Sequence, residues 1–342
     1  MSTPKVLLIY TGGTIGMVAD ARSGALRAMD LDHLEQQVPE LVRMGVALET
    51  VSFGTPIDSS DMHPAHWVRI AQIIGERHAE FDGFVVLHGS DTMAYTASAL
   101  SFLLENLAKP VILTGSQLPL GTIRTDGKEN LLTAIEIAAA KENGQPIVAE
   151  VAVYFEYSLY RGNRTVKVHA ERFEAFRSLN WPVLAEAGTH IRYDRTALLP
   201  ARSGTLKVHA RMDNGVGVIS LFPGIRAEAV RAQLADPGLK AAVIETFGSG
   251  NGPTDGDFLQ VLREARGRGI VLVNVTQCVG GRVEQGRYQT SRALADMGVV
   301  SGQDLTTEAA ITKLMFLLGQ DLEQEEVMLR MGKPLCGELA LP

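Results

Sequence analysis

The sequence predicts an α/β protein made of two doubly wound, mainly parallel α/β domains. Short apolar runs rich in strand-forming residues alternate with stretches of helical length, which is typical of βαβ units. The runs are apolar on both sides, so helices should cover both faces of each sheet. The alternation stops between residues 191 and 214 and then resumes. We therefore expect an N-terminal domain at 1–190, a linker at 191–214 and a C-terminal domain at 215–342.

The bulk composition excludes several classes of protein. A chain of 342 residues can bury two separate cores. Its net charge of −7 argues against nucleic acid or an anionic membrane as the main partner and leaves small polar substrates open. Two cysteines, Cys278 and Cys336, cannot build a disulfide framework, which favours a reducing compartment. Without a secretory apolar segment or a run of transmembrane length, we expect a cytoplasmic protein with no membrane partner.

In the N-terminal half, strands are expected at 6–9, 46–51, 84–87 and 111–113, and all but the second are apolar runs. Helices are expected at 31–38, 63–79, 93–107 and 129–140, with a mobile loop at 17–30. The second helix shows the signals best. His63-Pro64 opens it, and Trp67, Ile70 and Ile74 lie on one face. The third is rich in alanine and leucine and stops before Pro110.

Each of these strands runs directly into a polar segment, and each segment contains glycine. In open α/β sheets, ligands bind outside the carboxyl ends of the strands. We therefore expect Thr14, Ser59, Ser90 with Asp91, and Ser116 to converge on one crevice.

The rest of the chain continues the same pattern. A strand-like stretch at 147–157 precedes a turn and strand at 160–168, which carries Lys167 in a basic run. After the linker, strands are expected at 216–221, 241–247 and 270–275, followed by a helical pair at 307–331.

The segment Tyr10–Gly16 is the strongest chemical feature. Gly12 and Gly13 permit positive φ and a close approach of a ligand to the backbone. Thr14 then stands where backbone N–H groups could face a developing negative charge. A phosphate-binding turn is the alternative, but Thr11 replaces the first glycine of the G-x-G-x-x-G pattern. We therefore favour an activated threonine.

A threonine hydroxyl needs a base or a positive environment to act as a nucleophile. Lys167 and Asp91 are the candidates, and Ser90 could link them in a hydroxyl–lysine–carboxylate relay. For Lys167 the alternative is a surface ion pair, which spacing alone favours. For Ser90 and Asp91 it is an N-cap of the helix that begins near Met93.

Three other reactive residue types receive structural interpretations. His88 ends an apolar strand and is expected to be a core residue with one hydrogen bond. His63 and His66 lie one helical turn apart without an evident third ligand, so no metal site is expected. Cys278 has no thiolate-stabilising neighbour in the sequence and is expected to be buried.

Two segments closely resemble the signatures of a known family: Thr11-Gly12-Gly13-Thr14-Ile15-Gly16 and the run from His88 to Thr96. They resemble those of the bacterial-type L-asparaginases, and the segments at 58–62, 113–117, 160–167 and 274–278 also look like its cytoplasmic (type I) branch. The resemblance covers essentially the whole chain. It implies a larger N-terminal and a smaller C-terminal α/β domain, no cofactor, and a homodimer or dimer of dimers that acts on L-asparagine.

The resemblance also implies roles for single residues. Thr14 matches the nucleophilic threonine, Ser59 the serine that holds the substrate α-carboxylate, and Asp91 the aspartate that binds the α-ammonium group and belongs to the relay. Lys167 matches the relay lysine, and Asn251 an asparagine that approaches the neighbouring subunit's site. We group Ser60 and Ser116, from the same matched segments, with the substrate-binding residues.

Two departures from the family pattern leave alternatives open. The family usually has threonine at Ser90, and serine lacks the methyl group that restricts χ1. It also usually has a tyrosine in the loop that corresponds to 17–30, where this chain has Gly24-Ala25 at about that position. A non-catalytic asparagine sensor is therefore one alternative. The amidase subunit of a tRNA-dependent amidotransferase is another, although it would bring an additional N-terminal domain.

Overall fold

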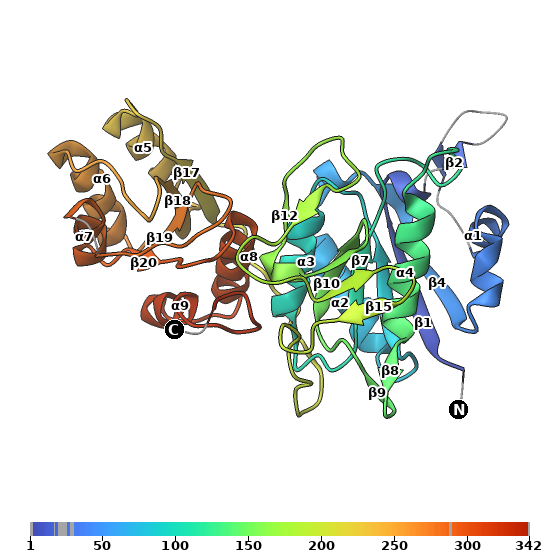
Figure 1. Ribbon diagram of the computed structural model, residues 1–342. Coiled ribbons are helices and arrows are strands. Elements are labelled where there is room, and N and C mark those ends of the chain that lie inside the picture. Colours follow the sequence, from blue (N-terminus) through green and yellow to red (C-terminus); the bar gives the residue numbers. More distant parts are fainter. Residues whose placement is uncertain (1–2, 17, 20–25, 28–30, 287–288, 341–342) are drawn as a thin grey trace. The chain divides into compact units, whose positions relative to one another are not determined.

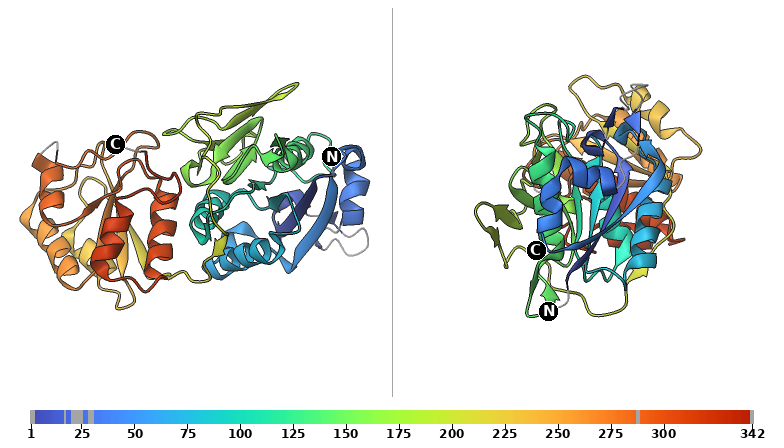
Figure 2. Two further views of the ribbon diagram at one scale, coloured as in Figure 1. Left: turned by 90° about the horizontal axis from the view of Figure 1, so that it is seen from below. Right: turned by 90° about the vertical axis from the view of Figure 1, so that its right-hand side faces the viewer.

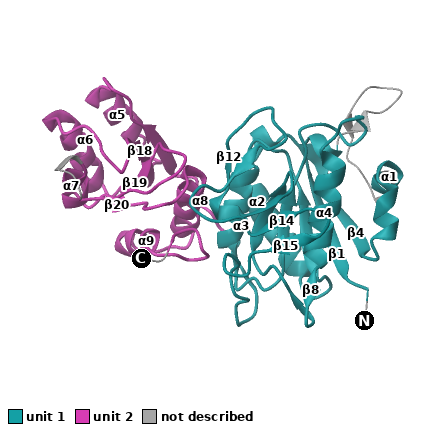
Figure 3. Ribbon diagram, viewed as in Figure 1, with its two compact units in different colours: residues 1–210 teal, residues 211–342 magenta. Residues whose placement is uncertain are grey.

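The computed structural model describes residues 3–16, 18–19, 26–27, 31–286 and 289–340. The chain divides into two compact units, residues 1–210 and 211–342 (Figure 3). Residues 191–214, the expected linker, contain two short strands of unit 1, β15 (Ile191–Tyr193) and β16 (Lys207–Val208).

Unit 1 is built on an eight-stranded sheet with the order β15-β14-β11-β10-β7-β5-β1-β4. Figure 1 labels five of these strands, β15, β10, β7, β1 and β4. Five neighbouring strands are parallel: β4 (Ala47–Ile57), β1 (Lys5–Gly12), β5 (Gly83–Leu87), β7 (Val111–Thr114) and β10 (Val151–Phe155). The mainly parallel sheet is therefore confirmed.

The remaining three strands of this sheet pair antiparallel: β11 (Ser158–Arg161), β14 (Ala185–Ala187) and β15. The stretch at 147–157 was expected to be one strand, but it contains only β10 and the start of a hairpin. Glu156 and Tyr157 form its two-residue loop with φ of 44° and 67°, as a type I′ turn requires. The turn reverses the chain, so that β11 runs antiparallel to β10 and to the parallel strands beyond it.

Helices cover both faces of this sheet, as Figure 2 shows. The α1 helix (Leu31–Gln37) and the α4 helix (Gly127–Ala139) pack in one buried cluster with Val6, Leu8 and Tyr10 of β1. The alternate side chains of β1, Leu7 and Ile9, are also fully buried and face the other side. That side is covered by α2 (Pro64–Arg77) and α3 (Met93–Leu103).

The third expected helix ends four residues earlier than the sequence indicated. Leu104 and Glu105 form the short strand β6, which pairs with β16. Asn106 follows with a φ of 62°, which cannot continue a helix. The earlier end therefore results from pairing with residues about a hundred positions away, which no local pattern reveals.

Short elements complete unit 1. They are the 3₁₀ helices η1 (Thr14–Gly16), η2 (Pro39–Arg43), η3 (Ser59–Asp61) and η4 (Gly162–Arg164), and the paired strands β2 (Val18–Ala19) with β3 (Leu26–Arg27), β8 (Lys141–Glu142) with β9 (Gln145–Pro146), and β12 (Val166–Lys167) with β13 (Phe176–Arg177). The expected loop at 17–30 thus contains the β2–β3 pair, and its other residues lie outside the described ones.

Unit 2 has a four-stranded, wholly parallel sheet with the order β17-β18-β19-β20. Its strands are β17 (Val216–Ser220), β18 (Ala241–Thr246), β19 (Val271–Thr276) and β20 (Val300–Ser301). Its helices are α5 (Ala227–Leu234), α6 (Gly256–Gly267), α7 (Gln289–Asp296), α8 (Thr307–Leu318) and α9 (Gln324–Met331). The resumed βα pattern and the last helical pair are confirmed. Among helices of the described ranges, none has the length and apolarity needed to span a bilayer.

Candidate active site

The turn after β1 depends on glycine at two positions. Gly12 and Gly13 have φ of 139° and 85°, which side-chain-bearing residues rarely adopt. A Cβ on Gly12 would lie 2.1 Å from the carbonyl oxygen of Ile57, and one on Gly13 would lie 2.4 Å from the amide nitrogen of Gly89. The turn is therefore pressed against the ends of β4 and β5. Thr14 comes next, partly exposed, as the first residue of η1.

Two further turns meet at the same place. Ser59 follows β4 and is 4% exposed, and its Oγ lies 2.5 Å from where a Cβ of Gly89 would stand. Thr92 holds the Ser59 turn by donating its hydroxyl to the Ser59 carbonyl oxygen at 2.6 Å. A Cβ on Gly115, after β7, would lie 2.3 Å from the His88 carbonyl oxygen. The turns that carry Thr14, Ser59, Ser90 and Ser116 therefore lie side by side.

Lys167 contacts both of its expected partners. Its Nζ lies 2.8 Å from Ser90 Oγ and 2.6 Å from Asp91 Oδ1. The lysine side chain is 15% exposed and that of Asp91 is 67% exposed, so this ion pair is not a purely superficial one. The alternative of a helix cap is wrong, because Thr92 is the N-cap residue of α3 and its side chain makes no capping hydrogen bond. The arrangement is a hydroxyl, an ammonium group and a carboxylate in direct contact.

Gln117 belongs to this site, although sequence analysis did not single it out. Ser90 Oγ donates to Gln117 Oε1 at 3.1 Å. The Gln117 backbone is held by the buried carboxylate of Asp126, which accepts from the Gln117 and Leu118 amides. Its place directly after a strand, in the same polar segment as Ser116, was the available signal.

His88 is fully buried and bridges two elements. One ring nitrogen, Nδ1, lies 2.7 Å from the Gly89 carbonyl oxygen, and Nε2 lies 2.8 Å from Thr96 Oγ1. Since a carbonyl only accepts, Nδ1 carries the hydrogen and Nε2 accepts from Thr96, whose hydroxyl also accepts from Trp67 Nε1 at 2.9 Å. Burial lowers the pKa of His88 from 6.5 to about 4, so the ring is neutral. A core histidine was expected, and it makes two hydrogen bonds instead of one.

The other histidines and Cys278 have simple outcomes. His63 Nδ1 accepts from the Ala65 amide, and His66 Nδ1 accepts from the His63 amide, so both rings cap the start of α2. The expectation that Cys278 is buried is wrong, because its side chain is exposed on the segment after β19. The segment leaves the sheet into a polar loop, where no core covers it.

The remaining candidate residues have varied surroundings. Ser60 is exposed, and its hydroxyl and amide both donate to Asp58 Oδ1 at 2.9 Å. Ser116 is 2% exposed, and among the described residues its hydroxyl has no hydrogen-bond partner. Asn251, in unit 2, forms a two-way backbone bridge with Phe247 at 2.9 Å. The position that would correspond to the family tyrosine, Gly24-Ala25, lies outside the described residues.

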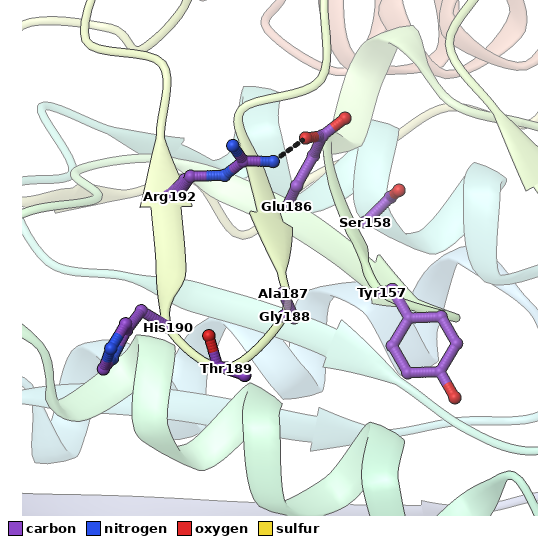
Figure 4. Close-up of a pocket in the computed structure, with 8 residues that line it drawn as sticks. All are labelled: Tyr157, Ser158, Glu186, Ala187, Gly188, Thr189, His190 and Arg192. Atoms are coloured by element: carbon purple, nitrogen blue, oxygen red, sulfur yellow. Dashed lines mark hydrogen bonds and ion pairs between the residues drawn. The ribbon is translucent and has the colours of Figure 1, made fainter.

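A separate hollow lies in unit 1 at the end of the β14–β15 hairpin (Figure 4). It has a volume of about 480 Å³. Its lining includes Tyr157 and the exposed ion pair between Arg192 and Glu186, 3.2 Å apart. None of the candidate site residues contributes to it, so it offers no alternative location for the chemistry.

Comparisons with known proteins cover nearly the whole chain. The asparaginase N-terminal model matches residues 5–199, and the glutaminase/asparaginase C-terminal domain matches residues 215–331. L-asparaginase 1 of Escherichia coli (strain K12) is 48% identical over 343 residues, which cover 99% of each chain. L-asparaginase I from Vibrio cholerae has a similar structure, with a TM-score of 0.89 and 43% identity over 99% of this chain and 100% of that one. The thermostable L-asparaginase from Thermococcus kodakarensis gives a TM-score of 0.90 at 33% identity, with 99% and 100% covered.

Proposed function

Since the chain belongs to the asparaginase family, we propose that it hydrolyses the side-chain amide of L-asparagine to L-aspartate and ammonia. The observation that carries this proposal is the contact of Lys167 with both Ser90 and Asp91, beside the glycine turn that presents Thr14. A threonine on a glycine turn that packs against the segment carrying such a relay suits acyl transfer.

In the first half of the reaction, the Thr14 hydroxyl attacks the side-chain carbonyl carbon. A β-aspartyl ester forms and ammonia leaves. The developing oxyanion is stabilised by backbone N–H groups of the glycine-rich turns, a contribution of roughly 3–4 kcal/mol for each well-placed donor. The positive φ of Gly12 and Gly13 and the close packing on Gly89 support this role, because they hold the turn rigid.

In the second half, Ser90, Lys167 and Asp91 activate a water molecule that hydrolyses the ester. The partial burial of Lys167 supports its part, because a mostly covered lysine interacts more strongly with its neighbours than a solvated one. Asp91 remains exposed enough to bind a second cation, the α-ammonium group of the substrate.

Substrate binding is assigned to Ser59, Ser60, Asp91, Ser116 and Asn251. The position of Ser59 against Gly89 supports its part in holding the α-carboxylate. Ser116 is buried, and within the described residues its hydroxyl has no hydrogen-bond partner, which supports its part in binding. Asn251 would serve a neighbouring subunit, so the proposal includes a homodimer or a dimer of dimers. No cofactor takes part. We place the protein in the cytoplasm, which agrees with its two cysteines, neither of which forms a disulfide.

Ammonia release tests the proposal. Purified protein is incubated with L-asparagine, and ammonia and aspartate are measured in parallel with a Lys167→Met variant. We expect equimolar products from the wild-type protein and loss of turnover in the variant, since methionine fills the space without a charge. Asparagine binding without turnover in the wild-type protein would instead identify a sensor.

A further inference from the structure

The side-chain amide of Gln117 joins two segments of unit 1 that meet beside Ser90. Its Nε2 lies 3.1 Å from the carbonyl oxygen of Ala170 and 3.0 Å from that of Arg172. Carbonyl oxygens only accept hydrogen bonds, so the amide nitrogen must face them. The amide oxygen therefore faces Ser90 Oγ, at 3.1 Å.

This orientation determines where the Ser90 hydroxyl hydrogen points. The amide oxygen of Gln117 can only accept, so Ser90 donates to it. Lys167 Nζ donates to the same hydroxyl oxygen from 2.8 Å. A hydroxyl has one hydrogen and two lone pairs, so one lone pair remains to accept a hydrogen bond that orients the attacking water. The proton lost by that water goes to the Thr14 oxygen when the ester bond breaks.

Serine needs such a restraint more than threonine does. Its side chain has three staggered rotamers and no methyl group to narrow the choice. A change of rotamer would carry Oγ away from Lys167 and Gln117 together. We propose that Gln117 is a positioning residue that holds Ser90 in its relay rotamer, in place of the methyl group of threonine. This inference rests on the function proposed for Ser90.

Both ends of the restraint are themselves held. The Gln117 amide N–H donates to the two carboxylate oxygens of Asp126 at 3.1 and 2.9 Å, and Asp126 is 4% exposed. The turn at 170–172 is closed by His169 Nδ1, which accepts from the Glu171 and Arg172 amides at 3.1 Å. Gln117 therefore acts from a rigid base, and its hydrogen bond can select one rotamer of Ser90.

A double-mutant cycle tests the inference. We would measure kcat and KM for asparagine in the full-length wild-type protein, Gln117→Met, Ser90→Thr and the double variant. Methionine has the length of glutamine without its hydrogen bonds. We expect Gln117→Met to lower kcat about 3- to 10-fold, as for the loss of one ordinary hydrogen bond, with KM unchanged. Ser90→Thr alone should change kcat less than about 2-fold, and the double variant should match it.

Gln320→Met is the matched control. Gln320 also donates its Nε2 to two carbonyl oxygens, those of Arg211 at 3.2 Å and Phe316 at 3.0 Å, and it belongs to unit 2. Its replacement should leave kcat unchanged. An effect in Gln117→Met would then come from the contact with Ser90 and not from losing a glutamine that bonds two carbonyl oxygens.

Several results would overturn the inference. One is an equal fall of kcat with and without Ser90→Thr, and another is a change confined to KM. A several-fold rise of kcat in Ser90→Thr alone would also do so, whatever the folding of the Gln117 variant. Crystal structures give a readout without turnover: we expect one Ser90 rotamer in the wild-type protein and several in Gln117→Met. If the wild-type protein released no ammonia, the proposed function would fail, and the rotamers would still decide the role of the Gln117 hydrogen bond.

Discussion

Thr14 stands on a turn whose shape depends on the glycines before it and not on its own side chain. Thr14→Ala should therefore abolish turnover while the fold and asparagine binding persist. Calorimetric binding and thermal unfolding would be measured beside ammonia release, with Thr196→Ala, an exposed threonine, as the control. Turnover near the wild-type rate in Thr14→Ala would refute the nucleophile assignment.

Ser90 stands where the family resemblance leads us to expect threonine, and its hydroxyl is in contact with both Lys167 and Gln117. Ser90→Ala removes the oxygen and leaves the lysine with Asp91 alone. We expect kcat to fall at least ~100-fold, the lower end of the effect of losing a positioned proton-transfer group. A rapid-quench search for the β-aspartyl ester would show whether it accumulates. A nearly normal rate would show that water is activated elsewhere.

His88 should make stability depend on pH. Its folded-state pKa of about 4 lies below the ordinary 6.5, so the unfolded chain binds a proton first as the pH falls. The stability that this neutral ring contributes is complete above pH 6.5 and is lost between pH 6.5 and 4, by about 3 kcal/mol. Urea unfolding at several pH values should show this slope. The dependence of stability on pH should weaken in His88→Gln. It should persist in the control His190→Gln, because His190 is exposed. An unchanged slope in His88→Gln would contradict the assignment.

Among the elements, the turn between β1 and η1 is the one in which close backbone packing should matter for the reaction. Gly13 and Gly45 both have positive φ, 85° and 65°, but a Cβ would meet the Gly89 backbone at Gly13 and nothing within 4 Å at Gly45. Gly45→Ala should cost about 1 kcal/mol of stability through strain alone, with kcat unchanged. Gly13→Ala should cost more and should lose turnover, because the Thr14 and Gly89 turns must separate.

Chemical denaturation and kcat measured on both alanine variants would test this contrast. Equal losses of stability with normal turnover in both would mean that the contact between the two turns does not matter for the reaction.

The elements were largely predictable from the sequence, and each error has an identifiable physical cause. The runs at 6–9, 84–87 and 111–113 became buried parallel strands, because burial on both faces leaves a pattern within a few residues. The stretch at 46–51 became part of the edge strand β4, which is only partly covered. The end of α3 at Leu103 was missed because it depends on pairing between β6 and β16. The β10–β11 hairpin was missed because Glu156 and Tyr157 are unusual residues for a type I′ turn.

For the molecule as a whole, substrate choice should follow from distances between separate turns. If Asp91 and Ser59 hold the α-ammonium and α-carboxylate groups, the side-chain length determines where the amide carbon lies relative to Thr14. Glutamine has one more methylene, and a misplacement of about 1 Å can cost on the order of 100-fold in rate. We expect kcat/KM to favour asparagine by about that factor when the two amides are assayed side by side. Equal values would contradict the proposal that Asp91 and Ser59 hold the two α-groups, and would indicate a general glutaminase-asparaginase.

The sequence alone determined the α/β class, the family, and the placement of each polar segment at the end of a strand. Those features are local: they depend on the periodicity of apolar residues and on glycines within one turn. Only the tertiary structure decided which side chains touch. Lys167 lies 77 positions from Ser90, and Gln117 lies 27 positions from it, so their contacts depend on strand order and on the η4 and β12 segments. The neutral state of His88 and the exposure of Cys278 were likewise decided by burial, which the neighbours in space set and the neighbours in sequence do not.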